Sequence, residues 1–423
     1  MRYSVLSKRL SLGEVQRKCA QAGAVNIKIK PIVQQVYCDL SPDAAAKLAK
    51  EHGLKVNPVK SVRPIKPILV PNVMPVLGAG LNLYTTYNET RQYFSPALNG
   101  AGLTVALLDS GVRASHEALF GKVLLEENFT GTPTADDIYG HGTGVAYIIA
   151  GSYGEKSGVA PGAKIMSMKV LNNVGEGSDE TVVDAIERVC ELVQEAIDDG
   201  LLMTDDMYPN TINLSAGSED DGDPDNPMRV ACQAAVEEYG LQIIAAAGNF
   251  GPDASTILCP ASDPLVVAVG GLETWNFEVW EFSSRGPTME GIVKPDLVCW
   301  AEAIEVASHK GDNEYDVKSG TSFSTPILVG VDGLLWDLAR RRYGENMRVT
   351  YYDWLPYAYA YCIKPPGIQV AKDNSYGYGI PALAPMVSRL MAPEISATTI
   401  VESAMPLMML MAIMPMITSV GGT

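Results

Sequence analysis

Apolar and polar positions along residues 1–60 form short, separate runs. The expected strands are Tyr3–Leu6, Asn26–Lys30, Val36–Leu40 and Leu54–Asn57. Between them the pattern predicts two helices. The first begins at Ser11, with Glu14 three residues later as in a capping box. The second begins at Ser41, before a proline that suits the first helical position. The order β-α-β-β-α-β is typical of a small ferredoxin-like α+β domain.

Residues 101–390 follow another pattern, in which apolar strands alternate with amphipathic helices. The expected strands are Leu103–Leu108, Ile165–Val170, Thr211–Leu214, Ile243–Ala247 and Leu265–Val269. The expected helices are Asp179–Asp199, Asn226–Tyr239 and Thr321–Tyr343. This alternation predicts an α/β fold, with a mostly parallel sheet covered on both faces.

Two further segments flank this region. Residues 61–100 contain the stretch SVRPIKPILVPNVMP, and such Pro-rich sequence predicts an extended, exposed linker open to cleavage. Residues 391–423 hold six methionines within Met405–Met416. The apolar run Ala404–Ile417 has 14 residues, fewer than the roughly 18 of a membrane-spanning helix. We expect a tail that packs on the body or on a neighbouring subunit of an oligomer, with membrane contact as the second interpretation.

Charge is distributed unevenly along the chain. The net charge of −17 argues against nucleic acid as a partner. Residues 1–75 carry 13 Lys and Arg against 4 Asp and Glu, or +9, so the remainder carries −26. A basic N-terminal part could dock on an acidic body, although the asymmetry could equally serve solubility alone.

Cysteine usage and the N-terminal residues bear on the compartment. The seven cysteines are widely scattered without a CxxC pair, which predicts free, mostly buried thiols and no disulfide framework or zinc site. The first residues lack the apolar run of a secretory signal. We therefore expect a cytoplasmic protein, with release by another route as the alternative.

Two segments place an acid and a base where a site would form. The apolar strand VALLDSGV ends on Asp109, and sites in parallel sheets form at the carboxyl ends of strands. A carboxylate there can hold an imidazole in one tautomer, while a turn or cap aspartate is the alternative. His141 lies between two glycines at the start of a helical pattern, 32 residues after Asp109.

Two more segments add a hydroxyl and an amide. In SGTSFSTP, Ser322 stands at the start of a long helix, whose positive end favours developing negative charge. Read alone, Ser322 is an ordinary helix cap, and Ser324 or Ser319 would serve as well. The strand IIAAAGNFGP ends near Asn249, whose side-chain amide could donate to an oxyanion.

Together these four segments resemble the subtilisin-like (S8 family) serine proteases, in which Asp, His and Ser follow one another in this order. The resemblance covers residues 101–390 and implies a three-layer subtilisin-like fold with endopeptidase activity. It implies that Ser322 attacks the peptide carbonyl, that His141 transfers the proton and that Asp109 orients His141. The Asn249 side chain and the Ser322 backbone N–H would form the oxyanion hole.

The resemblance also implies a cleft for protein or peptide substrates. The segment INLSAG resembles the strand that pairs with substrate, so Ser215, Ala216 and Gly217 would line the substrate cleft. The opposite wall of the pocket for the residue before the scissile bond would be Ala246, Ala247 and Gly248. Phe250 would shape that pocket for an apolar residue.

Residues 1–60 resemble the I9-like propeptides that assist folding and inhibit the enzyme until cut. The chain would then be a self-inhibited zymogen whose own propeptide is a partner. An alternative is a latent or single-event protease that acts mainly as a binding or assembly module, which the Met-rich tail and the atypical loops motivate.

The loop Glu219–Asp225, EDDGDPD, follows the expected substrate strand. It could coordinate calcium through carboxylate oxygens, select basic residues in the substrate, or simply be solvated. The family's common calcium-binding aspartate is replaced by Ala118, so that site is expected to be absent. We assign no other metal or cofactor.

Overall fold

The structure is a computed structural model of the 423-residue chain. It describes residues 1–50, 53–64, 97–154, 156–273, 277–345, 347, 359–365, 368 and 370–383. The chain divides into two compact units, Met1–Met386 and Val387–Thr423. The second unit, with the Met-rich tail, and residues 65–96 of the expected linker lie outside the described residues. No helix in the described part has the length and apolar character needed to cross a membrane.

The N-terminal module has the expected ferredoxin-like order of elements. It comprises β1 (Arg2–Ser7), α1 (Leu12–Gln21), β2 (Val25–Lys30), β3 (Gln35–Asp39), α2 (Pro42–Ala49) and β4 (Leu54–Pro58). Its antiparallel strands lie in the order β2-β3-β1-β4. Both helices begin where the caps predict, because Ser11 forms a capping box with Glu14 and the Ser41 hydroxyl accepts the Ala44 N–H.

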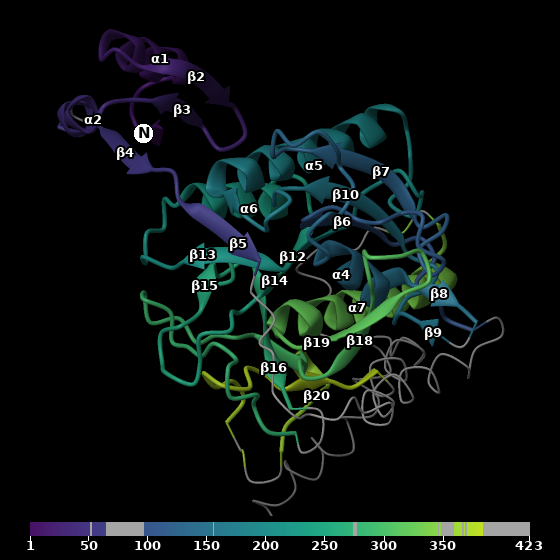
Figure 1. The fold of residues 1–423 in the computed structure, drawn as a ribbon. Coiled ribbons are helices and arrows are strands. Elements are labelled where there is room, and N and C mark those ends of the chain that lie inside the picture. Colours follow the sequence, from purple (N-terminus) through teal and green to yellow (C-terminus); the bar gives the residue numbers. More distant parts are fainter. Residues whose placement is uncertain are drawn as a thin grey trace, which may run out of the picture. The chain divides into compact units, whose positions relative to one another are not determined.

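The body contains a seven-stranded sheet in the order β17-β16-β14-β12-β6-β10-β7, and all its pairs are parallel. Its strands are β6 (Thr104–Asp109), β7 (Val123–Asn128), β10 (Lys164–Lys169), β12 (Thr211–Leu214), β14 (Gln242–Ala246), β16 (Val267–Leu272) and β17 (Leu297–Trp300). The helices are α4 (Gly142–Ala150), α5 (Asp179–Asp198), α6 (Pro227–Glu237) and α7 (Thr321–Tyr343). Figure 1 shows α5 with α6 on one face of the sheet and α4 with α7 on the other. The predicted sheet, covered on both faces, is confirmed.

The two outermost strands of this sheet were not predicted. β7, with the sequence VLLEEN, is only half-buried, so its apolar run is short. β17 is fully buried but only four residues long. Because the apolar runs of β7 and β17 are short, their sequences show too little periodicity to predict a strand, and only pairing with neighbouring strands identifies them.

The first residues of the expected exposed linker form a strand instead. β5 (Ser61–Pro64) lies between β11 (Gly177–Ser178) and β13 (Ala216–Glu219), and β15 (Leu258–Cys259) completes this small sheet. Val62 of β5 is fully buried. The local Pro-rich sequence predicted exposure, but partners more than 100 residues away bury the strand.

Three short two-stranded ladders complete the described strands. They are β8 (Ser152–Tyr153) with β9 (Lys156–Ser157), β18 (Ile304–Ala307) with β19 (Tyr315–Lys318), and β20 (Cys362–Ile363) with β21 (Ile380–Pro381). All seven cysteines are free thiols, and six of them are buried, as the sequence predicted.

Candidate active site

Asp109 and His141 form a buried hydrogen-bonded pair. Asp109 is the last residue of β6, and His141 is the residue that precedes α4. His141 Nδ1 lies 2.8 and 2.9 Å from the two carboxylate oxygens of Asp109. This pairing places the proton on Nδ1 and makes Nε2 the basic nitrogen. Nε2 is buried and has no hydrogen-bond partner among the described residues.

A second carboxylate holds the segments on both sides of this pair. Asp137 Oδ1 accepts the Ser110 hydroxyl at 2.8 Å and the Gly140 N–H at 2.6 Å. Asp137 Oδ2 accepts the N–H and the hydroxyl of Thr143, at 2.9 and 2.6 Å. Because Ser110 follows Asp109 and the other two flank His141, Asp137 fixes the backbone that carries the pair. The sequence does not identify it, because Asp137 lies five positions before Gly142, the first residue of α4, and so outside the cap and first turn where acidic residues signal a helix start.

Ser322 lies in the first turn of α7 and is fully buried. Its hydroxyl donates to the Ser215 carbonyl at 3.1 Å, and the Ser215 hydroxyl donates to the Ser322 carbonyl at 3.1 Å. The next residue, Phe323, packs on the imidazole of His141, with ring centroids 5.4 Å apart. This contact brings the N-terminus of α7 to the N-terminus of α4.

The other two candidate serines are engaged elsewhere. The Ser324 hydroxyl donates to the Thr321 carbonyl within the same helix, at 2.9 Å. Ser319 Oγ accepts the Ala303 N–H at 2.9 Å and so fixes a loop. Both side chains therefore serve local backbone structure.

Asn249 reaches the start of α7 because Gly320 has no side chain. Gly320 has φ 149° and ψ 156°, a conformation that residues with a side chain rarely adopt, and a Cβ there would lie 3.0 Å from Asn249 Nδ2. Asn249 Oδ1 accepts both the N–H and the hydroxyl of Thr321, at 3.0 Å each. Because its oxygen is bound in this way, the amide presents its nitrogen to the N-terminus of α7.

A cleft of about 880 Å³ opens beside Asn249, and its lining does not include Asp109, His141 or Ser322. Its lining comprises Ser61, Arg63, Gly217, Ser218, Glu219, Asp220, Asn249, Phe250, Ser255, Thr256, Ile257, Leu258 and Met289. Of the residues expected to bind substrate, Gly217, Asn249 and Phe250 line the cleft, and Phe250 is 63% exposed. The others, Ser215, Ala216, Ala246, Ala247 and Gly248, are buried and do not line it.

The acidic loop Glu219–Asp225 meets lysines of the N-terminal module and of the residues that follow it. Lys60 Nζ lies 2.6 Å from Asp221 Oδ2. Lys55 Nζ contacts Asp223 and lies 3.1 Å from Asp225 Oδ2. Among the residues that the structure describes, no three His, Cys, Asp or Glu side chains converge to hold a metal ion. Ammonium groups are thus among the observed partners of the loop, and calcium binding there stays a prediction.

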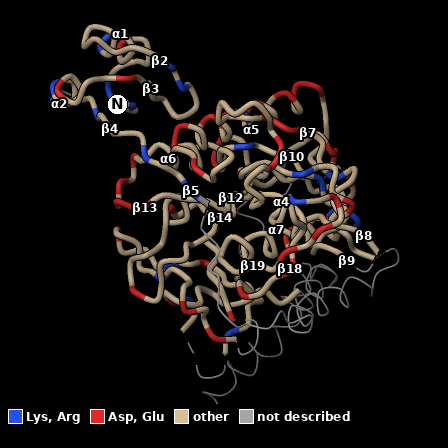
Figure 2. Tube along the Cα trace, viewed as in Figure 1, with Lys and Arg blue, Asp and Glu red and all other residues tan. Residues whose placement is uncertain are grey.

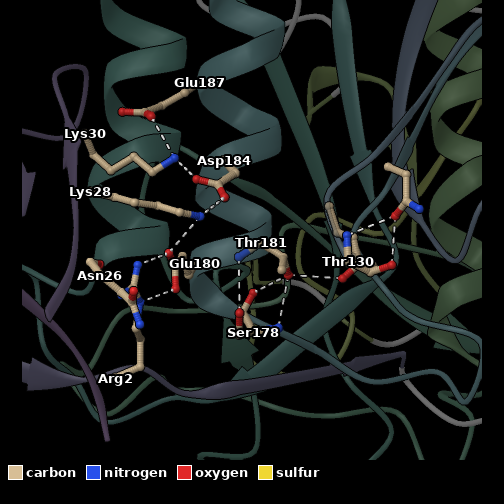
Figure 3. A network of polar contacts seen from close by, with 12 residues as sticks. Arg2, Asn26, Lys28, Lys30, Thr130, Ser178, Glu180, Thr181, Asp184 and Glu187 are labelled. Carbon is tan, nitrogen blue, oxygen red and sulfur yellow. Dashed lines mark hydrogen bonds and ion pairs between the residues drawn. The ribbon is translucent and has the colours of Figure 1, made fainter. Parts of the chain in front are cut away.

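A second set of ion pairs joins the module to helix α5. Arg2 Nε and Nη2 donate to the two carboxylate oxygens of Glu180, at 2.8 and 2.7 Å. Lys30 contacts Asp184 and lies 3.2 Å from Glu187 (Figure 3). Figure 2 shows basic positions on β2 and β4, and acidic positions near α5 and β13. The charge asymmetry of the sequence thus corresponds to real contacts between the two regions.

Burial at this interface shifts several pKa values. Burial raises the pKa of Asp179 to about 7, although the Lys60 N–H donates to its carboxylate at 3.0 Å. Burial also lowers the pKa of the Lys30 ammonium. Burial is also the largest single effect on Glu180 and works against its ionisation, but the hydrogen bonds and charges of Arg2 and Lys28 together lower its pKa. The interface therefore contains ionised pairs beside a carboxyl group that titrates near neutrality.

Comparison with known families gives one extended match. A sequence model of the Subtilase family matches residues 100–379. Similar curated proteins include Serine protease AprX of Bacillus subtilis (strain 168), 31% identical over 266 residues, which are 56% of this chain and 58% of that protein. Another is Subtilisin of Bacillus sp. (strain TA39), 31% identical over 56% of this chain and 57% of that protein. The match thus spans less than two thirds of the length of these relatives.

Two solved structures have a similar fold. The fold resembles Sphericase with a TM-score of 0.55 and 26% identity, over 67% of this chain and 92% of that one. It also resembles fervidolysin from Fervidobacterium pennivorans, described as a keratinolytic enzyme related to subtilisin. Here the TM-score is 0.69 over 93% of this chain and 61% of that one, and the 22% identity makes this a likeness of fold alone.

Proposed function

The chain belongs to the subtilase family, and from that premise we propose that it is a serine endopeptidase that hydrolyses protein or peptide substrates. The observation that carries this proposal is the pairing of His141 Nδ1 with both oxygens of Asp109, at the end of β6. Phe323 links this pair to the N-terminus of the helix that bears Ser322. In the structure the Ser322 hydroxyl donates to the Ser215 carbonyl, so completion of an acyl-transfer triad requires Oγ to turn from this carbonyl to His141 Nε2.

The proposed reaction begins with attack of Ser322 Oγ on the carbonyl carbon of the substrate. His141 Nε2 takes the hydroxyl proton, and the Asp109 carboxylate stabilises the imidazolium that forms. The oxyanion of the tetrahedral intermediate is held by the Ser322 N–H and by Asn249 Nδ2, at the positive end of α7. The peptide C–N bond then breaks, and His141 protonates the leaving amine. Water attacks the carbonyl carbon of the acyl-enzyme while His141 takes a proton from it. The ester bond to Ser322 Oγ then breaks, His141 returns the proton to Oγ, and the acid product leaves.

The N-terminal module is proposed as a propeptide that inhibits this site. β5 pairs antiparallel with β13, the strand expected to bind substrate, with Arg63 opposite Gly217 and Pro64 opposite Ala216. Ser61 and Arg63 line the same cleft as Asn249. A substrate strand could not enter while β5 is there. We therefore expect the chain to be cut within the first few residues after Pro64.

The test compares the intact mass and the fluorophosphonate labelling of the full chain with those of its Ser322→Ala variant. We expect the wild-type chain to release an N-terminal fragment and to label at Ser322, while the variant stays whole. Asp206→Asn, a change at an exposed carboxylate, is the matched control and should behave as wild type. If wild type and Ser322→Ala both stay whole and unlabelled, in one homogeneous multi-subunit particle, the assembly-module alternative replaces the endopeptidase.

A further inference from the structure

Strand β5 occupies the cleft as an extended chain and therefore serves as a guide to how a substrate strand binds there. Ser61 and Arg63 line the cleft, while Val62 between them is fully buried. Such alternation is that of a strand whose successive side chains point to opposite sides. Val62 also pairs with Gly177 and Arg63 with Gly217, so β5 is held on both sides. A substrate bound to β11 and β13 in this register would present its side chains to the same surroundings.

Lys60, just before β5, reaches the acidic loop. Its Nζ lies 2.6 Å from Asp221 Oδ2 and 3.5 Å from the Glu219 carbonyl oxygen. Its backbone is fixed as well, because its N–H donates to Asp179 and its carbonyl accepts the Asp179 N–H, both at 3.0 Å. Lys60 is therefore seated as part of the bound strand rather than as a loose surface side chain.

Two carboxylates of the loop accept hydrogen bonds from the loop's own backbone. Asp221 Oδ1 accepts the Asp223 N–H at 3.2 Å, and Asp223 Oδ1 accepts the Asp225 N–H at 3.0 Å. Burial is the largest single effect on Asp221 and opposes its ionisation, but the hydrogen bond from Lys60, the Asp223 N–H and the Lys60 charge together lower its pKa. Once the N-terminal module leaves, Lys60 and Lys55 leave with it, and the loop loses these two cationic partners beside the open cleft.

We propose that the loop Glu219–Asp225, through Asp221, selects substrates with Lys or Arg two residues before the residue that takes the place of Val62. This inference rests on the proposed function and names the substrate class of the same site. Lys60 is the first cation to occupy the position, and a basic residue of a later substrate replaces it. Asp221 is a specificity-determining residue and takes no part in the chemistry.

The test uses the full chain after incubation to constant Ser322-dependent activity. The probes are peptides with the sequence of residues 60–65, Lys-Ser-Val-Arg-Pro-Ile, followed by a chromogenic amide, with Lys, Ala or Glu at the first position. The Lys peptide should have a kcat/KM about two- to fivefold above the Ala peptide, as expected for a partly exposed ion pair. The ratio should approach one in about 0.5 M NaCl. Asp221→Lys should make the Glu peptide the preferred one.

Asp206→Asn is the matched control, because Asp206 is a similarly exposed carboxylate outside the acidic loop, and its cationic neighbour is Lys164 and not Lys60. It should keep the wild-type ratio between peptides. Equal hydrolysis of the three peptides, or a Lys preference that survives Asp221→Lys in a folded variant, would overturn the inference and leave the proposed function intact. If no peptide is hydrolysed in a Ser322-dependent way, the proposed function fails and this inference with it.

Discussion

Ser215 and Ser322 exchange hydrogen bonds, since the hydroxyl of each donates to the backbone carbonyl of the other at 3.1 Å. Ser215 immediately precedes β13, on which β5 lies, and Ser322 is in the first turn of α7. The two bonds therefore connect the start of β13, one strand of the cleft, to the first turn of α7, which carries the Ser322 hydroxyl. A substitution at Ser215 should therefore alter the position of Ser322.

Ser215→Ala should lower both stability and turnover. It removes the donor to the Ser322 carbonyl and leaves the buried Asn213 amide without the acceptor that lies 3.1 Å away. A loss of about 1–3 kcal/mol in the free energy of unfolding is expected, measured by urea denaturation, together with a lower kcat. Ser167→Ala is the control, because that hydroxyl is buried without a hydrogen-bond partner among the described residues. Equal losses in both variants would contradict the role given to Ser215.

Asp137→Asn should lower kcat with little change in KM. Its two oxygens accept four hydrogen bonds, and an amide can accept with one oxygen only, so the Thr143 or the Ser110 side must move. A displacement of the His141 backbone by about 1 Å would reduce turnover about 10²-fold, measured by steady-state kinetics across pH. The control is Asp136→Asn, which keeps an oxygen for the Asp137 N–H. Full kcat in Asp137→Asn would show that the pair holds itself in place.

Asp179 should make the stability of the uncut chain depend on pH. Burial raises its pKa to about 7 from an ordinary value near 4, so the uncut, docked state binds a proton more tightly than the unfolded state. The contribution of protonated Asp179 to the free energy of unfolding is fully present below about pH 4 and is lost as the pH rises to about 7. Thermal unfolding of the Ser322→Ala chain from pH 5 to 8 should show wild-type Asp179 losing stability relative to Asp179→Asn as pH increases. A constant difference between the two would disprove the linkage.

Lys30 should be needed to hold the N-terminal module on α5. Lys30→Ala would leave Asp184 and Glu187 beside each other, largely buried and without their shared cation. Breaking one partner of such a group costs about 3–5 kcal/mol, and urea unfolding on the Ser322→Ala background would measure the loss. Lys47→Ala, at an exposed position on α2, serves as the matched control. Should both changes have the same small effect, the module would be held by its apolar contacts instead.

The sequence predicted most of the fold where a pattern is long or sharply bounded. Helix α7 and strand β12 have the predicted bounds, because the long helix ends before Gly344 and the four-residue strand lies between polar residues. The expected amphipathic pattern of α7 is wrong, since Thr321–Ala339 is buried on every side in the middle of the fold. Asp109 and His141 could be singled out because both stand at the ends of buried elements. Strands β7 and β17 could not be predicted, because their apolar runs are short and they are recognised as strands only by their pairing with neighbours in the sheet.

What the sequence could not supply were the partners of charged and extended segments. The loop Glu219–Asp225 has several chemically sensible uses, and Lys55 and Lys60 lie some 160 residues before it. The fate of Ser61–Pro64 was likewise hidden, because a Pro-rich tetrapeptide becomes a strand only when β11 and β13 flank it. Asp137 was overlooked because its role depends on the convergence of Ser110 with the residues around His141.

Strand β5 also determines what the molecule exposes once it is gone. Its removal leaves β11 and β13 as two open strand edges, each with backbone N–H and C=O groups that have lost their partners. Such edges accept any extended polypeptide, including a loop or a frayed end of another copy of the same protein. We therefore expect the N-terminal module, by covering these edges, to suppress self-association for as long as it stays attached.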